Sequence, residues 1–159
     1  MLSVNGRVLF YFAQALSEFD LTFFGFEIGS AEGQQTWEAL AVLVGLRVWK
    51  SWWHRVRSRL SIKADNMSAL AMVAYYKAKG SGVARIAREI ALEVADAEFG
   101  PDVCAHVPGV VNGVADALSR RYQPGRFFEV PGFLAEAKEV VPPNRSASWF
   151  RSLHPPSLW

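Results

Sequence analysis

The sequence predicts an α/β fold, with helices packed on a mixed sheet. Two observations lead to this prediction. Some segments are rich in Phe, Val, Leu and Tyr or alternate between apolar and polar residues, as strands do. Others carry apolar residues at the 3.6-residue spacing of a helix, and the expected order is strand, strand, helix, strand, helix, helix, strand, helix. The 159 residues are enough to form a hydrophobic core.

Two strands are expected near the N-terminus. Residues 7–15 and residues 21–28 are both apolar and aromatic, and the polar stretch 17–20 between them has the composition of a turn. This pattern predicts an antiparallel hairpin. The apolar stretch 8–16 is interpreted as buried strand and not as a secretion signal, because Gln14 interrupts it and no small-residue cleavage site follows.

Helices alternate with strands through the middle of the chain. A first helix is expected over residues 34–53, where the apolar positions fall at helical spacing. Residues 60–64 alternate in polarity and predict a short strand that ends at Asp65. A short helix over residues 69–76 is expected next, and Gly80-Ser81-Gly82 interrupts it before a longer amphipathic helix that carries Val83, Ile86, Ala87, Ile90 and Val94.

The last part of the predicted domain is a strand, a turn and a helix. Residues 103–107 form the strand, Pro108-Gly109 the turn, and Val111, Val114, Ala115 and Leu118 the apolar stripe of the helix. Six of the eight prolines lie at or after Pro124, so a boundary is placed near Tyr122. It separates a domain of residues 1–122 from a Pro-rich C-terminal extension of residues 123–159. That extension either covers exposed surface or leads to a further domain.

The single cysteine and the apolar pattern exclude several classes of protein. Cys104 cannot form an internal disulfide and suits a reducing compartment, and no Cys/His pattern of a zinc finger is present. No window approaches the roughly 20 apolar residues that cross a bilayer. An intracellular protein, cytoplasmic or nuclear, is therefore expected, with no membrane partner.

The positive charge is concentrated in one stretch. The net charge is only +2, but six cations and no acid lie between positions 47 and 63, which leaves 11 basic and 15 acidic residues elsewhere. The cations are Arg47, Lys50, Arg55, Arg57, Arg59 and Lys63, with Trp49, Trp52, Trp53 and His54 among them. Such a surface suits a phosphate backbone. The alternative is a helix C-terminus, where cations favour the dipole and tryptophans pack into the core.

Three acids lie where a hydrophobic core does not require them. Glu38 is beside the apolar stripe of the first helix, Asp65 follows a strand, and Asp116 is in the last helix. Carboxylates that converge from separate elements are typical of a Mg²⁺ site. Taken singly, each acid is better explained as a helix cap or as part of a solvated face. His106, at the end of the last strand, is by itself better explained by a hydrogen bond to a turn.

Three sequence motifs resemble ribonuclease H domains of retroelement polyproteins. Residues 105–120, AHVPGVVNGVADALSR, resemble that family's H-x-P-G-x-x-N-x-x-A-D-x-L-S-R ending. Residues 62–70, IKADNMSAL, are similar to its strand that ends in D-N or D-S, and residues 37–41, WEALA, to its E-x-x-A helix. The motifs occur in the family's order, and the resemblance covers about residues 4–122.

The resemblance implies a ribonuclease H-like fold and hydrolysis of the RNA strand of an RNA–DNA hybrid during reverse transcription. It implies that Glu38, Asp65 and Asp116 bind Mg²⁺, or Mn²⁺, with Asp65 the most central ligand, and that His106 assists proton transfer or product release. Substrate contacts are then expected from Arg55, Arg57, Arg59, Asn66 and Asn112. Recognition is expected through shape, phosphates and 2′-hydroxyls. The partners implied are the hybrid and the reverse transcriptase domain of the same polyprotein.

The sequence departs from that family at one ligand. The family carries a further aspartate on a first strand, whereas this sequence is expected to begin with the second strand, and no residue here matches that aspartate; Asp20 lies in a turn. Loss of one ligand from a two-metal site is expected to weaken metal binding. The chain is therefore expected to be an active nuclease domain, an inactive fragment or relic, or a non-catalytic module that binds nucleic acid or a polymerase through its basic, Trp-rich face.

Overall fold

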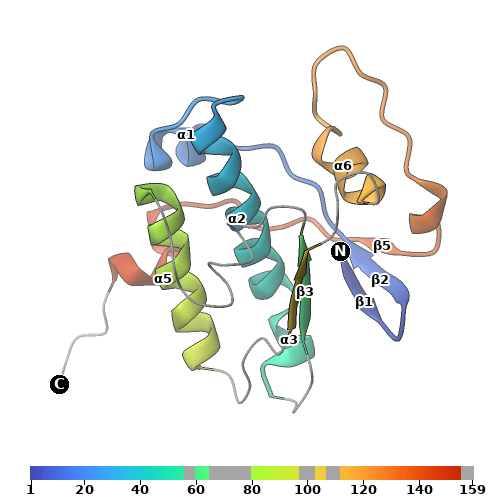
Figure 1. The fold of residues 1–159 in the computed structure, drawn as a ribbon, viewed down its shortest axis with the longest axis horizontal. Coiled ribbons are helices and arrows are strands. Elements are labelled where there is room, and N and C mark those ends of the chain that lie inside the picture. The colour runs from blue at the N-terminus through green and yellow to red at the C-terminus, as the bar shows by residue number, and fades with distance from the viewer. Residues whose placement is uncertain (56–59, 65–79, 97–102, 107–111, 155–159) are drawn as a thin grey trace.

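The computed structural model describes residues 1–55, 60–64, 80–96, 103–106 and 112–154 (Figure 1). The fold is mixed α/β, as the sequence predicted. The strands in the described residues form two sheets: a mixed sheet in the order β1-β2-β5 and a parallel pair, β3-β4. Their bounds are Leu2–Val4 for β1, Arg7–Tyr11 for β2, Ser61–Ala64 for β3, Val103–His106 for β4 and Lys138–Glu139 for β5.

The predicted hairpin between residues 7–15 and 21–28 is wrong. Strand β2 pairs instead with β1, which precedes it, across the Asn5-Gly6 turn. Both turn residues have positive φ, 51° and 80°, the backbone that two-residue hairpin turns require. Asn-Gly is a strong hairpin signal in a sequence, so the correct partner of β2 could have been found.

Residues of the expected second strand form helix α1, Glu18–Phe24, instead. The expected turn at 17–20 is the start of this helix. Ser17 Oγ accepts a hydrogen bond from the Asp20 backbone N–H (3.2 Å), and the Asp20 carboxylate accepts one from the Ser17 N–H (2.8 Å). This capping box satisfies N–H groups that would otherwise be unpaired, and Gly25 ends the helix with φ 73°. Local capping thus outweighs the strand propensity of the phenylalanines.

The expected first helix is divided in two. Helix α2 spans Ala31–Val48 and the short α3 spans Lys50–Trp53, with Trp49 between them at φ −105° and ψ 19°. Helix α2 begins three residues before the expected start, because the Ser30 hydroxyl accepts a hydrogen bond from the Gly33 N–H (3.1 Å).

Two further predicted helices are confirmed. Helix α5, Ser81–Ala95, is the amphipathic helix, and α6, Gly113–Ser119, follows β4. Strands β3 and β4 confirm the expected strands at 60–64 and 103–107 within a residue or so. The predicted helix at residues 69–76 and the Pro108-Gly109 turn lie outside the described residues.

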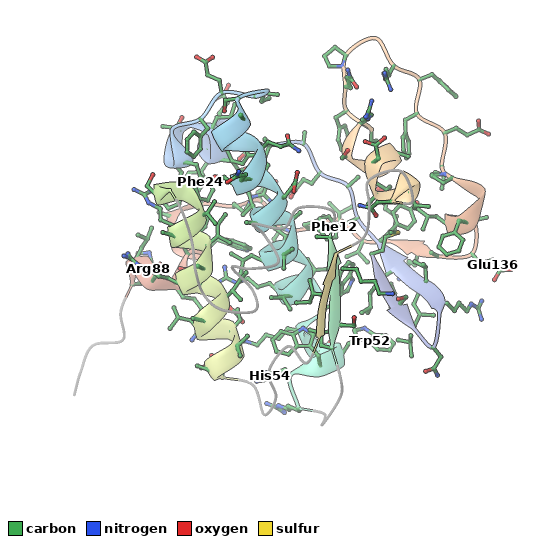
Figure 2. The ribbon with its side chains drawn as sticks, in the orientation of Figure 1. Phe12, Phe24, Trp52, His54, Arg88 and Glu136 are labelled. Atoms are coloured by element: carbon green, nitrogen blue, oxygen red, sulfur yellow. The ribbon has the colours of Figure 1, made fainter. Side chains whose placement is uncertain are left out.

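The main core lies between α1, α2 and α5. Helices α2 and α5 run side by side, and both sheets lie on the other side of α2 (Figure 1). The aromatic side chain of Phe24 joins α1 to this core (Figure 2). The buried members are Phe24, Ala39, Leu40, Leu43, Val44, Leu46, Trp53, Val83, Ile86, Ala87, Ile90 and Phe150. A smaller cluster of Tyr11, Leu118 and Leu134 fastens α6 to the β1-β2-β5 sheet.

The C-terminal extension packs on both clusters. After η2 (Gly132–Leu134) it adds β5 parallel to β2, and then crosses to α5, where η3 (Ala147–Trp149) and η4 (Arg151–Leu153) lie (Figure 1). Of the two roles that the sequence left open for it, the structure shows surface coverage. Among the described residues, no helix is long and apolar enough to cross a membrane.

Candidate functional site

The β3–β4 pair sets the position of the candidate site. The two strands are parallel, with Ser61 opposite Val103 and Ala64 opposite His106. Carboxyl ends of parallel strands meet at one edge, which is where ligands gather in α/β folds. The backbone of His106 therefore lies beside the residue that immediately precedes Asp65 in the sequence. Asp65 and Asn66 themselves lie outside the described residues, so the predicted central ligand is untested.

Helix α6 carries two more of the predicted residues. The Asp116 side chain is 50% exposed, and its Oδ1 pairs with the Arg120 guanidinium one turn later at 2.9 Å. A surface pair of this kind contributes only about 0.3–0.5 kcal/mol, so it does not commit the carboxylate to a structural role. Asn112 is the half-buried residue at the N-cap position of α6, where its side chain makes no capping hydrogen bond.

Glu38 lies half-buried in the second turn of α2, and only one of its oxygens is satisfied. Oε1 accepts a hydrogen bond from the Gln34 side-chain amide at 2.8 Å. Oε2 is buried, and it has no hydrogen-bond partner in the part of the chain that the structure describes. Buried carboxylate oxygens are normally paired, and an exception indicates a place for a water molecule or a cation. The donor atom is therefore of the kind that a metal-ligand role requires.

The described residues do not test whether the three acids form one cluster. Within residues 1–55, 60–64, 80–96 and 112–154, no three His, Cys, Asp or Glu side chains are grouped so that they could hold a metal ion. Since Asp65 falls outside these ranges, the predicted triad of Glu38, Asp65 and Asp116 is neither shown nor contradicted.

Two cations of the basic stretch are not available to a ligand. The Arg47 guanidinium pairs with Glu89 at 2.5 Å and with Glu93 at 2.9 Å, and Lys50 pairs with Glu93 at 2.9 Å. For these two residues the expected phosphate-binding surface is wrong, because both are used to neutralise buried acids. Arg55 remains exposed. Arg57 and Arg59 lie outside the described residues.

The tryptophans of this stretch are likewise partly buried in the core and partly exposed. Trp49 and Trp53 are buried, and the Trp53 indole N–H donates to the Leu46 carbonyl oxygen at 2.9 Å. Trp52 is 46% exposed; it lies at the α3 end of the molecule (Figure 2), with its ring 5.5 Å from that of Phe10 on β2. The helix-end interpretation therefore holds for Trp49 and Trp53, whereas Trp52 and Arg55 are exposed.

Comparisons with protein-family models, with curated proteins and with solved structures find no match to this chain.

The buried charges were not predicted from the sequence. Glu89 and Glu93 are almost fully buried on α5, and Asp20 and Arg145 are buried as a pair with nitrogen–oxygen distances of 2.7 Å. Glu89 falls between Ile86 and Ile90 on the apolar stripe of the predicted helix, and an acid in that position was a signal of a buried ion pair.

Their surroundings decide their charge state. Burial alone would raise the pKa of Glu89, but hydrogen bonds from Ser152, Arg151 and Arg47 outweigh it, and the pKa is lowered. Burial likewise opposes ionisation of Glu93, yet Lys50 and Arg47 lower its pKa. These acids are ionised and paired, which indicates a structural role.

Proposed function

We propose that this chain is a ribonuclease H-like domain that hydrolyses the RNA strand of RNA–DNA hybrids in the reverse transcription of a retroelement. The observation that supports this most is the β3–β4 pair. Its parallel register puts Ala64, which Asp65 follows in sequence, beside His106, and helix α6 with Asp116 comes next in the chain. Ribonuclease H domains of retroelements carry the corresponding acids and histidine in this order.

The side chains of the site have the chemistry that the proposal requires. Glu38, Asp65 and Asp116 would hold Mg²⁺ or Mn²⁺, and the Oε2 of Glu38, which has no partner among the described residues, fits such a role. Bound metal ions would activate a water molecule and stabilise the leaving oxygen of a phosphodiester. Asp116 keeps a half-exposed carboxylate. His106, by its position at the strand end, would hold or release a proton near the scissile phosphate.

Substrate contact is proposed for three arginines of the basic stretch and for two asparagines. Arg55 and, by sequence, Arg57 and Arg59 would contact phosphates. Asn66 and Asn112 are at the positions from which the resemblance implies contact with the hybrid. Because phosphates and 2′-hydroxyls carry little sequence information, we expect weak sequence preference and a steep loss of affinity with salt. The reverse transcriptase domain of the same polyprotein is the proposed protein partner.

The experiment is cleavage of an end-labelled RNA–DNA hybrid by the full chain in Mg²⁺ or Mn²⁺. We expect RNA-strand products from the unmodified chain and a loss of at least about 100-fold in rate for Asp65→Asn, as for other groups that stabilise charge in the reaction. The matched control is Glu129→Gln, an exposed acid of the extension, which should leave the rate unchanged.

Hybrid binding measured in parallel separates the alternatives. Cleavage that survives Asp65→Asn would contradict the assigned site. Salt-sensitive binding by a folded chain without cleavage would replace the nuclease proposal with that of a non-catalytic nucleic-acid module. A folded chain that neither binds nor cleaves the hybrid would overturn both.

A further inference from the structure

The C-terminal segment, residues 145–153, packs against α1, α2 and α5, and we call the surface of these helices that contacts it the α1–α2–α5 groove. Figure 1 shows η4 beside α5, with the β3–β4 pair on the other side of α2. The groove is therefore separate from the candidate site, and a role for it does not depend on the proposed function.

An aromatic side chain anchors the segment. Phe150 is 1% exposed and stacks on Phe23, with ring centroids 4.5 Å apart and an interplanar angle of 24°. Its edge meets the ring of Phe24 at 5.9 Å. The half-buried neighbour Trp149 lies under the Arg47 guanidinium, 4.0 Å from the ring centroid. Buried aromatic anchors of this kind dominate the energetics of peptide recognition.

The groove also binds the backbone of the segment. The two carboxylate oxygens of Glu89 accept hydrogen bonds from the backbone N–H groups of Arg151 (2.8 Å) and Ser152 (2.7 Å). Arg47 donates to the carbonyl oxygen of Trp149 at 2.5 Å. Side chains that form hydrogen bonds with the backbone of a bound peptide are a feature of peptide-binding sites, because these bonds fix the direction and register of the peptide.

One side chain of the segment adds a charge preference. The Arg151 guanidinium pairs with Asp96 at 2.7 Å and lies 3.6 Å from Glu93. Since Glu89, Glu93 and Asp96 all lie along α5 or at its end, this wall of the groove is acidic. It therefore favours an arginine directly after the phenylalanine anchor.

Ion pairs between the helices also restrain the carboxylates of the groove. Arg47 pairs with Glu89 and Glu93, and Lys50 pairs with Glu93, and all four residues belong to the α2–α3 and α5 stretches. None of these three ion pairs involves a residue of the segment, and side chains that are already restrained lose less freedom when a peptide binds.

The exposed residues of the segment lie between and after its contacts. Ser146, Ala147 and Ser148 are exposed between Arg145 and the anchors, and Leu153 is exposed after them. Pro142-Pro143-Asn144, which leads into the segment, has no regular secondary structure. The segment is thus held at Trp149, Phe150 and Arg151 and, at its N-terminal end, by the buried ion pair of Arg145 with Asp20.

We infer that the α1–α2–α5 groove is a peptide-recognition site for a Trp-Phe-Arg-Ser sequence and that the chain's own segment is its resident ligand. A partner that carries this pattern binds when the resident segment leaves. Covalent attachment gives the resident segment an effective concentration of the order of millimolar, so it excludes weaker competitors.

The test is fluorescence anisotropy of a labelled peptide with the sequence of residues 144–154, added to the full-length chain. Phe150→Ala and Arg151→Ala in the chain weaken the resident segment in two different ways. We expect both variants to bind the peptide at least about tenfold more tightly than the unmodified chain does. Leu153→Ala, a change at an exposed end of the segment, is the matched control and should resemble the unmodified chain.

Specificity and folding complete the test. A peptide with alanine in place of the phenylalanine should not bind any of the chains. The inference is wrong if folded Phe150→Ala and Arg151→Ala chains bind no better than the unmodified one, or if the alanine peptide binds equally well. It is also wrong if both variants lose their helical circular dichroism, because the segment is then an inseparable part of the core.

Discussion

The charged side chains of the α1–α2–α5 groove and those of the candidate site differ in how they are paired. In the groove, Glu89 and Glu93 are almost fully buried, and each of their carboxylates has cationic or N–H partners. Of the predicted metal ligands, Glu38 keeps a buried oxygen without a partner among the described residues, and Asp116 stays half exposed beside Arg120.

This difference distinguishes charges that hold a fold from charges that are available for chemistry. A buried charge that is fully paired has no free lone pair for a metal ion, and its removal exposes its partner to a large desolvation penalty. An unsatisfied carboxylate destabilises the folded state, and it persists where a ligand or a function compensates. Stability and activity are therefore expected to respond to different substitutions.

The largest effect is expected from Arg47→Met. The substitution leaves Glu89 without its cation and removes one of the three cations paired with Glu93, so it should lower the free energy of unfolding by about 3–5 kcal/mol. Urea denaturation followed by circular dichroism measures this. Arg88→Met, on an exposed position of α5, is the control and should change it by less than about 0.5 kcal/mol. Equal losses of stability in the two variants would show that the buried ion pairs contribute no more to stability than an exposed arginine does.

The next effect is a loss of stability in acid. The pKa values of Glu89 and Glu93 are lowered on folding from an ordinary value of 4.5, and that of Asp20 from 3.8, in spite of burial, by hydrogen bonds and ion pairs. Below pH 4.5 the unfolded chain takes up protons that the folded chain does not, so the stability present at neutral pH decreases.

A pH series of urea unfolding curves tests this. The unmodified chain should lose stability steadily below about pH 4.5. Glu93→Gln should be less stable at pH 7 and depend less on pH in that range. Glu129→Gln, at an exposed position, should follow the unmodified chain. A Glu93→Gln curve parallel to that of the unmodified chain would assign the acid sensitivity to other groups.

Glu38→Gln should separate stability from activity. Glutamine is nearly isosteric with glutamate. The substitution removes the charge of a carboxylate whose Oε2 has no partner in the described part of the chain. We expect the free energy of unfolding to stay within about 1 kcal/mol or to increase, while hybrid cleavage falls. Matched unfolding and cleavage assays on one preparation measure both. A large loss of stability would place Glu38 with the structural charges.

Periodicity predicted the elements whose residues pack on one face. The alternation at residues 60–64 and the apolar stripe of Val83, Ile86 and Ile90 gave β3 and α5, because burial on one side imposes a repeat on the sequence. Composition failed at residues 21–28. There the phenylalanines favour strand, but Ser17 and Asp20 cap a helix, and two hydrogen bonds outweigh a weak propensity.

The site was only partly predictable, for a related reason. Motif spacing located Glu38 and Asp116 on helices and His106 at a strand end, as the structure has them. It could not show that Arg47 and Lys50 point to acids far along the chain, because ion pairs between helices depend on how α2 and α5 pack. Nor could it show that the proline-rich extension contributes Phe150 to the core.

The smallest effect is expected from Asp116→Asn. Its partner Arg120 is 49% exposed, so loss of this surface pair should change the free energy of unfolding by less than about 0.5 kcal/mol. If the carboxylate serves the β3–β4 edge, cleavage of the hybrid should nevertheless fall sharply. Arg120→Gln removes the same pair while it keeps the acid, and it should leave cleavage nearly unchanged. Equal losses of cleavage in the two variants would mean that the pair, and not the free carboxylate of Asp116, supports the site.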